Sequence, residues 1–341
     1  MLDNAITLLL LLSTLVASSL ATTARVLIYS ATADFRHDSI PTAIQALQSK
    51  QSSFGIQFEN TEDKAQFTDQ ILAQYDALLF LDNTGEVLDD SGKAAFQKYL
   101  NLGGNYIGIH AASDCLRNTT FYGNEVGAFF DYHPALQNAT VDVIDASHPS
   151  TSMLPAQWHV QDEMYNFKTD PRAIGATVIL SANESSYVDT GTHLGQGTPH
   201  PTGNSSNLVP AAQLNENILL AWFQEHGAGV EDNGSSGRSF YTSLGHLNET
   251  WQDELFLAHV FGGITWTLQS NTTLAFNASA QVGNPVASTS NSTSSSSTSM
   301  LPTPSSSPSA MISCPSIDKF SVKFMIVSVI VAACFPWLLR L

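Results

Sequence analysis

Histidines lie at the ends of three apolar segments of this 341-residue chain. His37 follows the segment RVLIYS after a short turn sequence, His110 closes NYIGIH, and His246 closes RSFYTSLGH. A single histidine at such a position is usually a hydrogen-bonded structural residue, but parallel strands end at one edge of a sheet, where ligands bind. Histidines gathered there could transfer protons near neutral pH or, with a carboxylate, bind a divalent metal such as zinc. We therefore expect a catalytic or metal site built from these three residues, and the spacing leaves both chemistries open.

Polar side chains between these histidines could complete such a site. The adjacent carboxylates Asp162 and Glu163 are candidates to assist catalysis. Neighbours on an extended segment point to opposite faces, so we expect at most one of the two to face the site. Four further residues are candidates to bind and orient a substrate: Arg36, Asn83, His133 and Tyr165. His133 precedes a proline, so a rigid turn is an equally good interpretation of that pair.

Well-known catalytic templates are absent from the sequence. It contains no HExxH, no CxxC and no phosphate-binding loop, and no Gly-x-Ser-x-Gly follows a predicted strand. The turn after the fourth predicted strand carries His110 where a nucleophile would sit, and Cys115 lies five residues further on. Nucleophilic catalysis by a thiol or a hydroxyl group is therefore not indicated.

Strand and helix patterns alternate in the first half of the chain. We predict strands at 25–30, 56–58, 76–85 and 105–110, and helices at 40–51, 67–75 and 91–102. Such alternation with short links predicts an α/β fold with a mostly parallel central sheet that is covered on both faces. In the second half we predict strands at 140–145, 176–182 and 238–246, a loop at 183–215, and a last helix at 251–268 that begins with a capping box from Thr250 to Asp253.

Composition restricts the possible partners. Hydrophobic residues make up 43% of the chain, which is enough for a folded core. Thirteen basic residues against 30 acidic ones give a net charge of -17, which argues against a nucleic-acid partner because phosphate binding needs clustered Lys and Arg. Three cysteines cannot form a disulfide framework, and we expect Cys115 to be a buried free thiol.

Both ends of the chain have the pattern of processing signals. Residues 1–24 contain an apolar run followed by small residues, which predicts a secretory signal peptide. Residues 314–341 end in an apolar run of 16 residues, which would span only about 24 Å as a helix, less than the ~30 Å of a hydrocarbon core. The preceding small residues favour a GPI-anchor signal, with a C-terminal membrane segment as the alternative.

The region before this tail predicts a stalk. From residue 284 to 309, 20 of 26 positions are Ser, Thr or Pro, so we assign 25–275 to a globular domain and 276–313 to a glycosylated stalk. Nine Asn-x-Ser/Thr sequons support a secreted or cell-surface protein attached to the membrane at its C-terminus. We expect these asparagines near the surface.

Several motifs together resemble the ThuA-like (trehalose utilisation) family over about residues 25–268. They are DFRHDSI, LDNTGEVL, GGNYIGIHAASD, VGAFFDYHP, DEMYNF and GRSFYTSLGH. The resemblance implies a flavodoxin-like three-layer sandwich similar to class I glutamine amidotransferases. It does not imply amidotransferase activity, because His110 stands where those enzymes carry cysteine. The family usually has a His-Pro before the Trp of the segment 215–223; here His200-Pro201 lies earlier.

The resemblance implies a carbohydrate as ligand and leaves the reaction open. One hypothesis is an enzyme, such as a hydrolase or isomerase, that acts on a disaccharide or a modified glycoside. The alternative is a non-catalytic carbohydrate-binding or structural surface glycoprotein.

Overall fold

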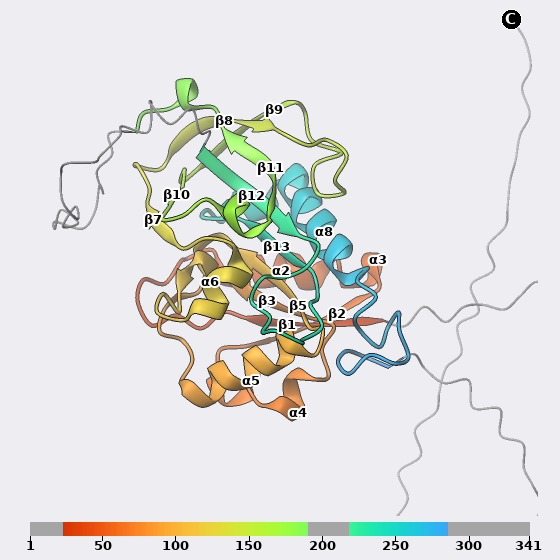
Figure 1. Cartoon of the computed structure of the whole chain (residues 1–341). Helices are drawn as coiled ribbons and strands as arrows, with labels where there is room; N and C mark the ends of the chain where they lie inside the picture. Colours follow the sequence, from red (N-terminus) through yellow and green to blue (C-terminus); the bar gives the residue numbers. More distant parts are fainter. Residues whose placement is uncertain (1–22, 190–217, 286–341) are drawn as a thin grey trace, which may run out of the picture. The chain divides into compact units, whose positions relative to one another are not determined.

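The described residues of the computed structural model, 23–189 and 218–285, contain one large sheet of nine strands (Figure 1). In spatial order the strands are β2 (Ile56–Thr61), β1 (Ala24–Tyr29), β3 (Ala77–Leu81), β5 (Asn105–Ile109), β13 (Ser239–Thr242), β12 (Ile218–Gln224), β11 (Thr177–Ala182), β8 (Gln137–Val143) and β9 (Gln157–Asp162). Two short pairs lie beside it: β4 (Thr84–Gly85) with β6 (Asp114–Cys115), and β7 (Phe130–Tyr132) with β10 (Asn166–Phe167).

Helices and turns connect the strands. The α-helices are α2 (Ile40–Ser49), α3 (Gln51–Phe54), α4 (Asp69–Leu72), α5 (Asp90–Asn101), α6 (Thr120–Val126) and α8 (Glu254–Leu268). Single 3₁₀ turns are η1 (Lys64–Gln66), η2 (His110–Ser113), η3 (Pro171–Ile174), η4 (Glu184–Ser186) and η5 (Thr250–Gln252).

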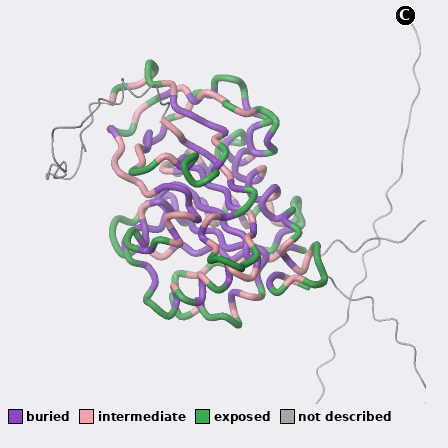
Figure 2. The backbone as a smooth tube through the Cα atoms, in the orientation of Figure 1, coloured by how far each residue is buried: buried purple, intermediate pink, exposed green. Residues whose placement is uncertain are grey.

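The first five strands of the sheet, from β2 to β13, all run parallel. Their apolar side chains alternate between two cores on opposite faces of the sheet. In β1, Val26 and Ile28 belong to the core with α2 and α8, whereas Leu27 and Tyr29 belong to the core with α5 and α6. Because both faces are covered, β3 and β5 are buried at every position (Figure 2). The predicted α/β fold with a parallel sheet at its core is confirmed.

The other half of the sheet is antiparallel, which the sequence did not predict. Strands β12, β11, β8 and β9 each run opposite to their neighbours. Between β8 and β9, residues 144–156 contain no α-helix, so the chain returns directly beside the strand it has just left. The expectation of a mostly parallel sheet is therefore correct only for the half that carries β1, β3 and β5.

The final helix begins later than the sequence indicated. Asp253, not Thr250, is the N-cap of α8, because its carboxylate accepts the Phe256 amide at 2.8 Å. Thr250 belongs to η5, a separate 3₁₀ turn with no side-chain cap. The sequence pattern placed the start of the helix too early because only the extended residue Asp253 separates the 3₁₀ turn from the helix.

The packed chain continues a little beyond residue 275. Val282 is buried and forms a β-bridge with Thr273, and the Gly283 amide donates to the Ala73 carbonyl at 2.9 Å. Nearly all of the predicted leader (1–24), most of the predicted stalk (276–313) and the whole tail (314–341) lie outside the described residues. Within the described part, no helix has the length and apolar character that crossing a membrane requires.

Seven of the nine sequon asparagines fall in the described part, and none of them is buried: Asn118, Asn138, Asn183, Asn233, Asn248, Asn271 and Asn277. Their side chains are therefore open to solvent, as the sequence predicts. The other two, Asn204 and Asn291, lie outside it.

Candidate metal centre

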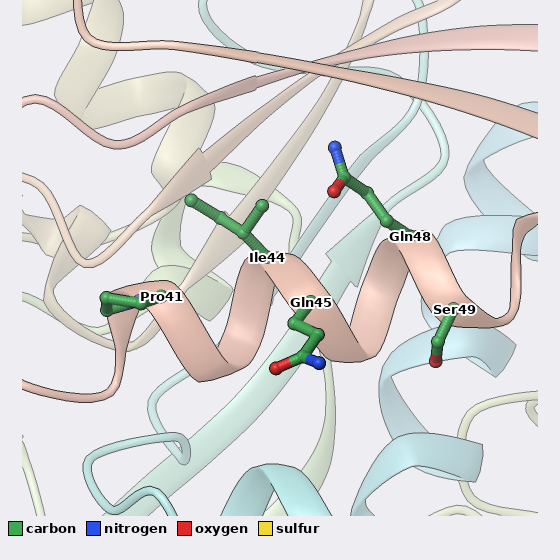
Figure 3. Close-up of a pocket in the computed structure, with 5 residues that line it drawn as sticks. All are labelled: Pro41, Ile44, Gln45, Gln48 and Ser49. Carbon is green, nitrogen blue, oxygen red and sulfur yellow. The ribbon is translucent and has the colours of Figure 1, made fainter.

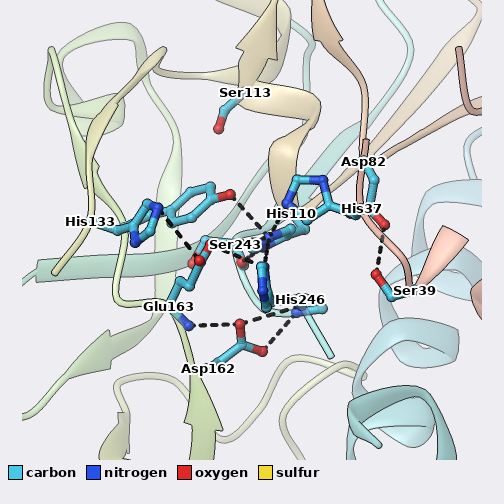
Figure 4. Close-up of polar contacts among 12 residues, drawn as sticks. His37, Ser39, Asp82, His110, Ser113, His133, Asp162, Glu163, Ser243 and His246 are labelled. Carbon is cyan, nitrogen blue, oxygen red and sulfur yellow. Dashed lines mark hydrogen bonds and ion pairs between the residues drawn. The ribbon is translucent and has the colours of Figure 1, made fainter. Parts of the chain in front are cut away.

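The three histidines meet at the carboxyl edge of the parallel strands (Figure 4). His110 directly follows β5 and has the left-handed φ of 52° that starts the sharp turn η2. His37 lies in the loop between β1 and α2, and His246 lies just beyond β13. Residues separated by up to 209 positions in the sequence are therefore close in space because the parallel strands β1, β3, β5 and β13 end at the same edge of the sheet.

Four potential ligand atoms converge at this edge. The His110 Nε2 atom lies 3.2 Å from His37 Nε2, 3.3 Å from His246 Nδ1 and 3.6 Å from a Glu163 carboxylate oxygen. One ligand atom from each of these four residues lies within 4.8 Å of all the others. Ligand bonds near 2.1 Å in a tetrahedral zinc site place ligand atoms about 3.4 Å apart, so the cluster approaches the geometry of a three-histidine, one-carboxylate site.

A backbone contact determines which nitrogen of His110 faces the cluster. Its Nδ1 atom lies 2.6 Å from the Ser243 carbonyl, which can only accept a hydrogen bond, so Nδ1 must carry the proton. The Nε2 atom is then an unprotonated acceptor, and the Tyr165 hydroxyl donates to it at 3.0 Å. An unprotonated Nε2 atom that faces two other imidazoles is the state in which histidine binds a metal, once the Tyr165 hydroxyl turns away from it.

Glu163 is the carboxylate that faces the histidines. Its Oε2 atom lies 3.2 Å from His246 Nδ1, and its Oε1 atom lies 3.5 Å from His133 Nε2. His133 donates from Nδ1 to the Pro134 carbonyl at 2.7 Å, so its other nitrogen is directed at Glu163. The carboxylate therefore bridges the buried cluster and a more exposed histidine.

Asp162 contacts the backbone around His246, not the histidine rings, and supports the turn that carries His246. Its two oxygens accept the Gly245 amide at 2.9 Å and the His246 amide at 3.4 Å, and it also accepts the Glu163 amide at 2.8 Å. Burial raises the pKa of Asp162 to about 6, against the opposing effect of the Gly245 and Glu163 amides. Asp162 thus holds the backbone of the site, while Glu163 is in the site itself.

Burial and charge set different protonation states for the three imidazoles. Burial, followed by the neighbouring His246, lowers the pKa of His37 to about 4. Burial and the two other histidines also hold the pKa of His110 well below its usual value. For His246 burial lowers the pKa, but the hydrogen bond and charge of Glu163 outweigh burial and raise it. At neutral pH two of the three rings are therefore neutral.

The remaining predicted residues divide into two groups. Tyr165 is buried between His110 and His133, with ring centroids 4.7 Å and 5.7 Å away, and is part of the cluster. Arg36 is exposed and forms an ion pair with Glu62 at 2.7 Å, outside the cluster. Asn83 is buried and donates from Nδ2 to the Ala31 carbonyl at 3.0 Å. His200 lies outside the described residues.

Solvent reaches the centre on the side of His246 and His133, whose side chains are 21% and 27% exposed. Phe35 stands on the same rim, is 60% exposed, and packs edge-on against His37 with ring centroids 4.8 Å apart. An exposed aromatic ring beside a polar site offers a flat apolar face to a ligand.

A hollow on the outer side of α2 is a poor alternative site (Figure 3). Its lining consists of Pro41, Ile44, Gln45, Gln48 and Ser49. None of these side chains titrates or is a usual metal ligand. This hollow therefore offers neither acid–base groups nor metal ligands.

One residue of the edge was not singled out in the sequence. Asp82 directly follows the apolar run of β3, is completely buried, and accepts the Ser39 hydroxyl at 3.3 Å (Figure 4). The signal was its position, since a carboxylate that immediately follows a buried parallel strand must lie at the edge where ligands bind.

The fold and the site together define an α/β protein with a histidine-rich centre at the carboxyl edge of its parallel strands. The ThuA family, described as trehalose utilisation, matches residues 25–267, and the chain belongs to that family. No curated protein matches the chain.

Two solved structures support the same fold. A ThuA-like protein from Bacteroides uniformis is similar at 19% identity and a TM-score of 0.54, over 74% of this chain and 94% of that chain. Another, from Parabacteroides merdae, is similar at 15% identity and a TM-score of 0.51, over 73% of this chain and 91% of that chain. At these identities the likeness shows the fold alone.

Proposed function

We propose that this protein is a metal-dependent enzyme that acts on a carbohydrate, such as a disaccharide or a modified glycoside. The observation that carries the proposal is the convergence of four ligand atoms around the unprotonated Nε2 atom of His110. Lone pairs of neutral imidazoles repel each other at 3.2 Å unless a proton or a cation lies between them. A divalent cation would satisfy all four groups at once.

The residues of the site have separate roles in this proposal. His37, His110, His246 and Glu163 would hold the metal, which would supply Lewis-acid chemistry when bound, with a water molecule or substrate oxygen entering as a fifth ligand. Tyr165 directs its hydroxyl group at the same point, and Asp162 fixes the backbone of Gly245 and His246. The reaction is a hydrolysis or an isomerisation of a sugar, since both need a proton to be moved to or from an oxygen or carbon atom of the sugar.

Family membership supports carbohydrate as the substrate class, because the family is described as trehalose utilisation. Phe35 and Arg36 lie in the loop after β1, and Arg36 pairs with Glu62 just after β2. There the exposed ring of Phe35 can contact a sugar face, and the charged groups can contact sugar hydroxyls. We further infer that the parallel half is a flavodoxin-like three-layer sandwich and that the protein is displayed at the cell surface.

The first test is zinc binding by the purified protein, measured by elemental analysis after dialysis and by chelator competition. His110→Ala and His246→Ala should weaken zinc binding by more than about 100-fold, since each removes a direct ligand. His159→Ala is the matched control, because His159 is an exposed histidine of β9 whose Nδ1 atom contacts only Thr140 at 3.1 Å. If the His110 variant retains zinc as tightly as the His159 variant, the metal centre is wrong.

The second test is turnover of trehalose and other disaccharides by the zinc-loaded protein. Loss of turnover in the His110 variant, with sugar binding retained, supports an enzyme. Sugar binding without turnover in the native protein would identify a non-catalytic carbohydrate-binding protein instead.

A further inference from the structure

Asp82 and His110 occupy matching positions at the ends of two adjacent strands. Leu81 of β3 pairs with Ile109 of β5, and the Asp82 amide donates to the Ile109 carbonyl at 3.2 Å. Both following residues adopt left-handed backbone conformations, with φ of 53° at Asp82 and 52° at His110. Such conformations are uncommon outside glycine and concentrate at functional sites.

The carboxylate of Asp82 is buried with few donors around it. Its Oδ2 atom accepts the Ser39 hydroxyl at 3.3 Å and the Ala111 amide also acts on the carboxyl group, while Oδ1 forms no well-aligned hydrogen bond. A buried carboxylate with an unpaired oxygen is costly unless a positive group or a donor lies beside it. Burial raises the pKa of Asp82 to about 8, although the Ser39 hydroxyl and the positive charge of His246 oppose this.

His37 has a buried ring nitrogen that lacks a hydrogen-bond partner. Its Nε2 atom faces His110, while its Nδ1 atom is buried without a partner. If Nε2 coordinates a cation, Nδ1 must carry the proton and needs an acceptor. Ser39 lies two residues after His37 and contacts Asp82, so the chain segment that carries the unpaired donor also reaches the carboxylate of Asp82 (Figure 4).

We propose that Asp82 is the positioning carboxylate of the metal centre, whose free Oδ1 accepts the Nδ1–H of His37 when His37 Nε2 coordinates a divalent cation. This inference rests on the proposed metal centre. Histidine ligands of metals commonly donate their second nitrogen to a carboxylate, which fixes the ring and strengthens the ligand. The negative charge of Asp82 would also offset part of the charge of the cation.

Asn83 is the principal competitor for this role. Its Oδ1 atom is also buried without a partner, and it is next to Asp82 in the sequence. It carries no charge, and its Nδ2 atom is already bound to the Ala31 carbonyl on the side of β1. The contact between Asp82 and Ser39 favours Asp82, and an Asn83→Ala variant separates the two residues experimentally.

The experiment measures zinc affinity of the full chain by competition with a chromophoric chelator. Asp82→Asn removes the charge and tolerates the left-handed backbone, and Asp82→Ala removes the acceptor as well. We expect zinc binding to weaken about 10-fold in the first and towards 100-fold in the second, the range for outer-sphere partners of metal ligands. Asn83→Ala should change zinc affinity less than either.

A double-mutant cycle tests whether Asp82 acts through His37. In a His37→Ala background, Asp82→Asn should cause little further loss of zinc affinity. An undiminished loss in that background would overturn the role through His37, as would zinc affinity of Asp82→Asn equal to that of the native protein. A larger effect of Asn83→Ala than of Asp82→Ala would also overturn it.

The proposed centre and the role of Asp82 fail in different ways. Zinc binding that survives His110→Ala refutes the centre itself. Zinc binding that is lost in His110→Ala but unchanged in Asp82→Asn refutes only the role of Asp82. Asp82→Asn keeps the size of the side chain and an oxygen that can accept from Ser39, so we expect it to fold, and circular dichroism with thermal unfolding checks this.

Discussion

His110 donates its Nδ1 proton to the Ser243 carbonyl at 2.6 Å, and this bond directs the other ring nitrogen at the centre of the site. Ser243 directly follows β13, three residues before His246. The backbone that places one histidine of the cluster therefore also selects the tautomer of another. Because the ring is already held in this orientation, less conformational entropy is lost when a metal or a substrate proton binds to its lone pair.

Zinc affinity should depend on pH through His246. Because the pKa of His246 is raised, its Nδ1 atom holds a proton against zinc at mildly acidic pH. The apparent affinity should fall roughly tenfold per pH unit below that pKa and level off above it, if one proton is released. Chelator competition from pH 5.5 to 8.5 measures this slope, and a flat profile would show that His246 is not a ligand.

Asp162 and Glu163 should respond differently to removal of charge. Asp162→Asn loses one acceptor for the Gly245 and His246 amides, and an unsatisfied buried amide costs about 1–3 kcal/mol, so the free energy of unfolding should fall. Glu163→Gln should weaken zinc binding with a smaller effect on metal-free stability. Urea unfolding and zinc titration of both variants make the comparison, and equal stability losses would contradict it.

Glu125 should make the protein less stable as pH rises. Burial raises the pKa of Glu125 from 4.5 to about 8, although the Gly229 amide donates to it at 2.9 Å and opposes the shift. Between these values the folded state keeps a proton that the unfolded state releases, so stability falls with rising pH by up to roughly 1.4 kcal/mol per unit.

Glu125→Gln removes this titration while an amide oxygen can still accept from Gly229. The variant should match the native protein in thermal stability near pH 4.5, and its advantage should grow up to about pH 8 and then stay constant. A pH-independent difference between the two proteins would exclude Glu125 as the cause.

Much of the fold followed from local patterns. Short apolar runs such as RVLIYS and NYIGIH are buried on both faces, and they became parallel strands within a residue or two of the predicted bounds. The direction of β9 was missed because residues 144–156 before it contain no helix whose spacing would reveal the direction of the strand. The buried state of Cys115 was also predicted and is confirmed.

The sequence by itself determined the family, the parallel core and the types of residue at the edge of the sheet. It placed His37, His110 and His246 at strand ends because strand periodicity is a local property of the chain. Only the tertiary structure decided that Glu163, not Asp162, faces these histidines and that Arg36 turns to Glu62. Side-chain direction depends on backbone turns and on partners distant in the sequence, such as the Ser243 carbonyl, and no local pattern encodes those contacts.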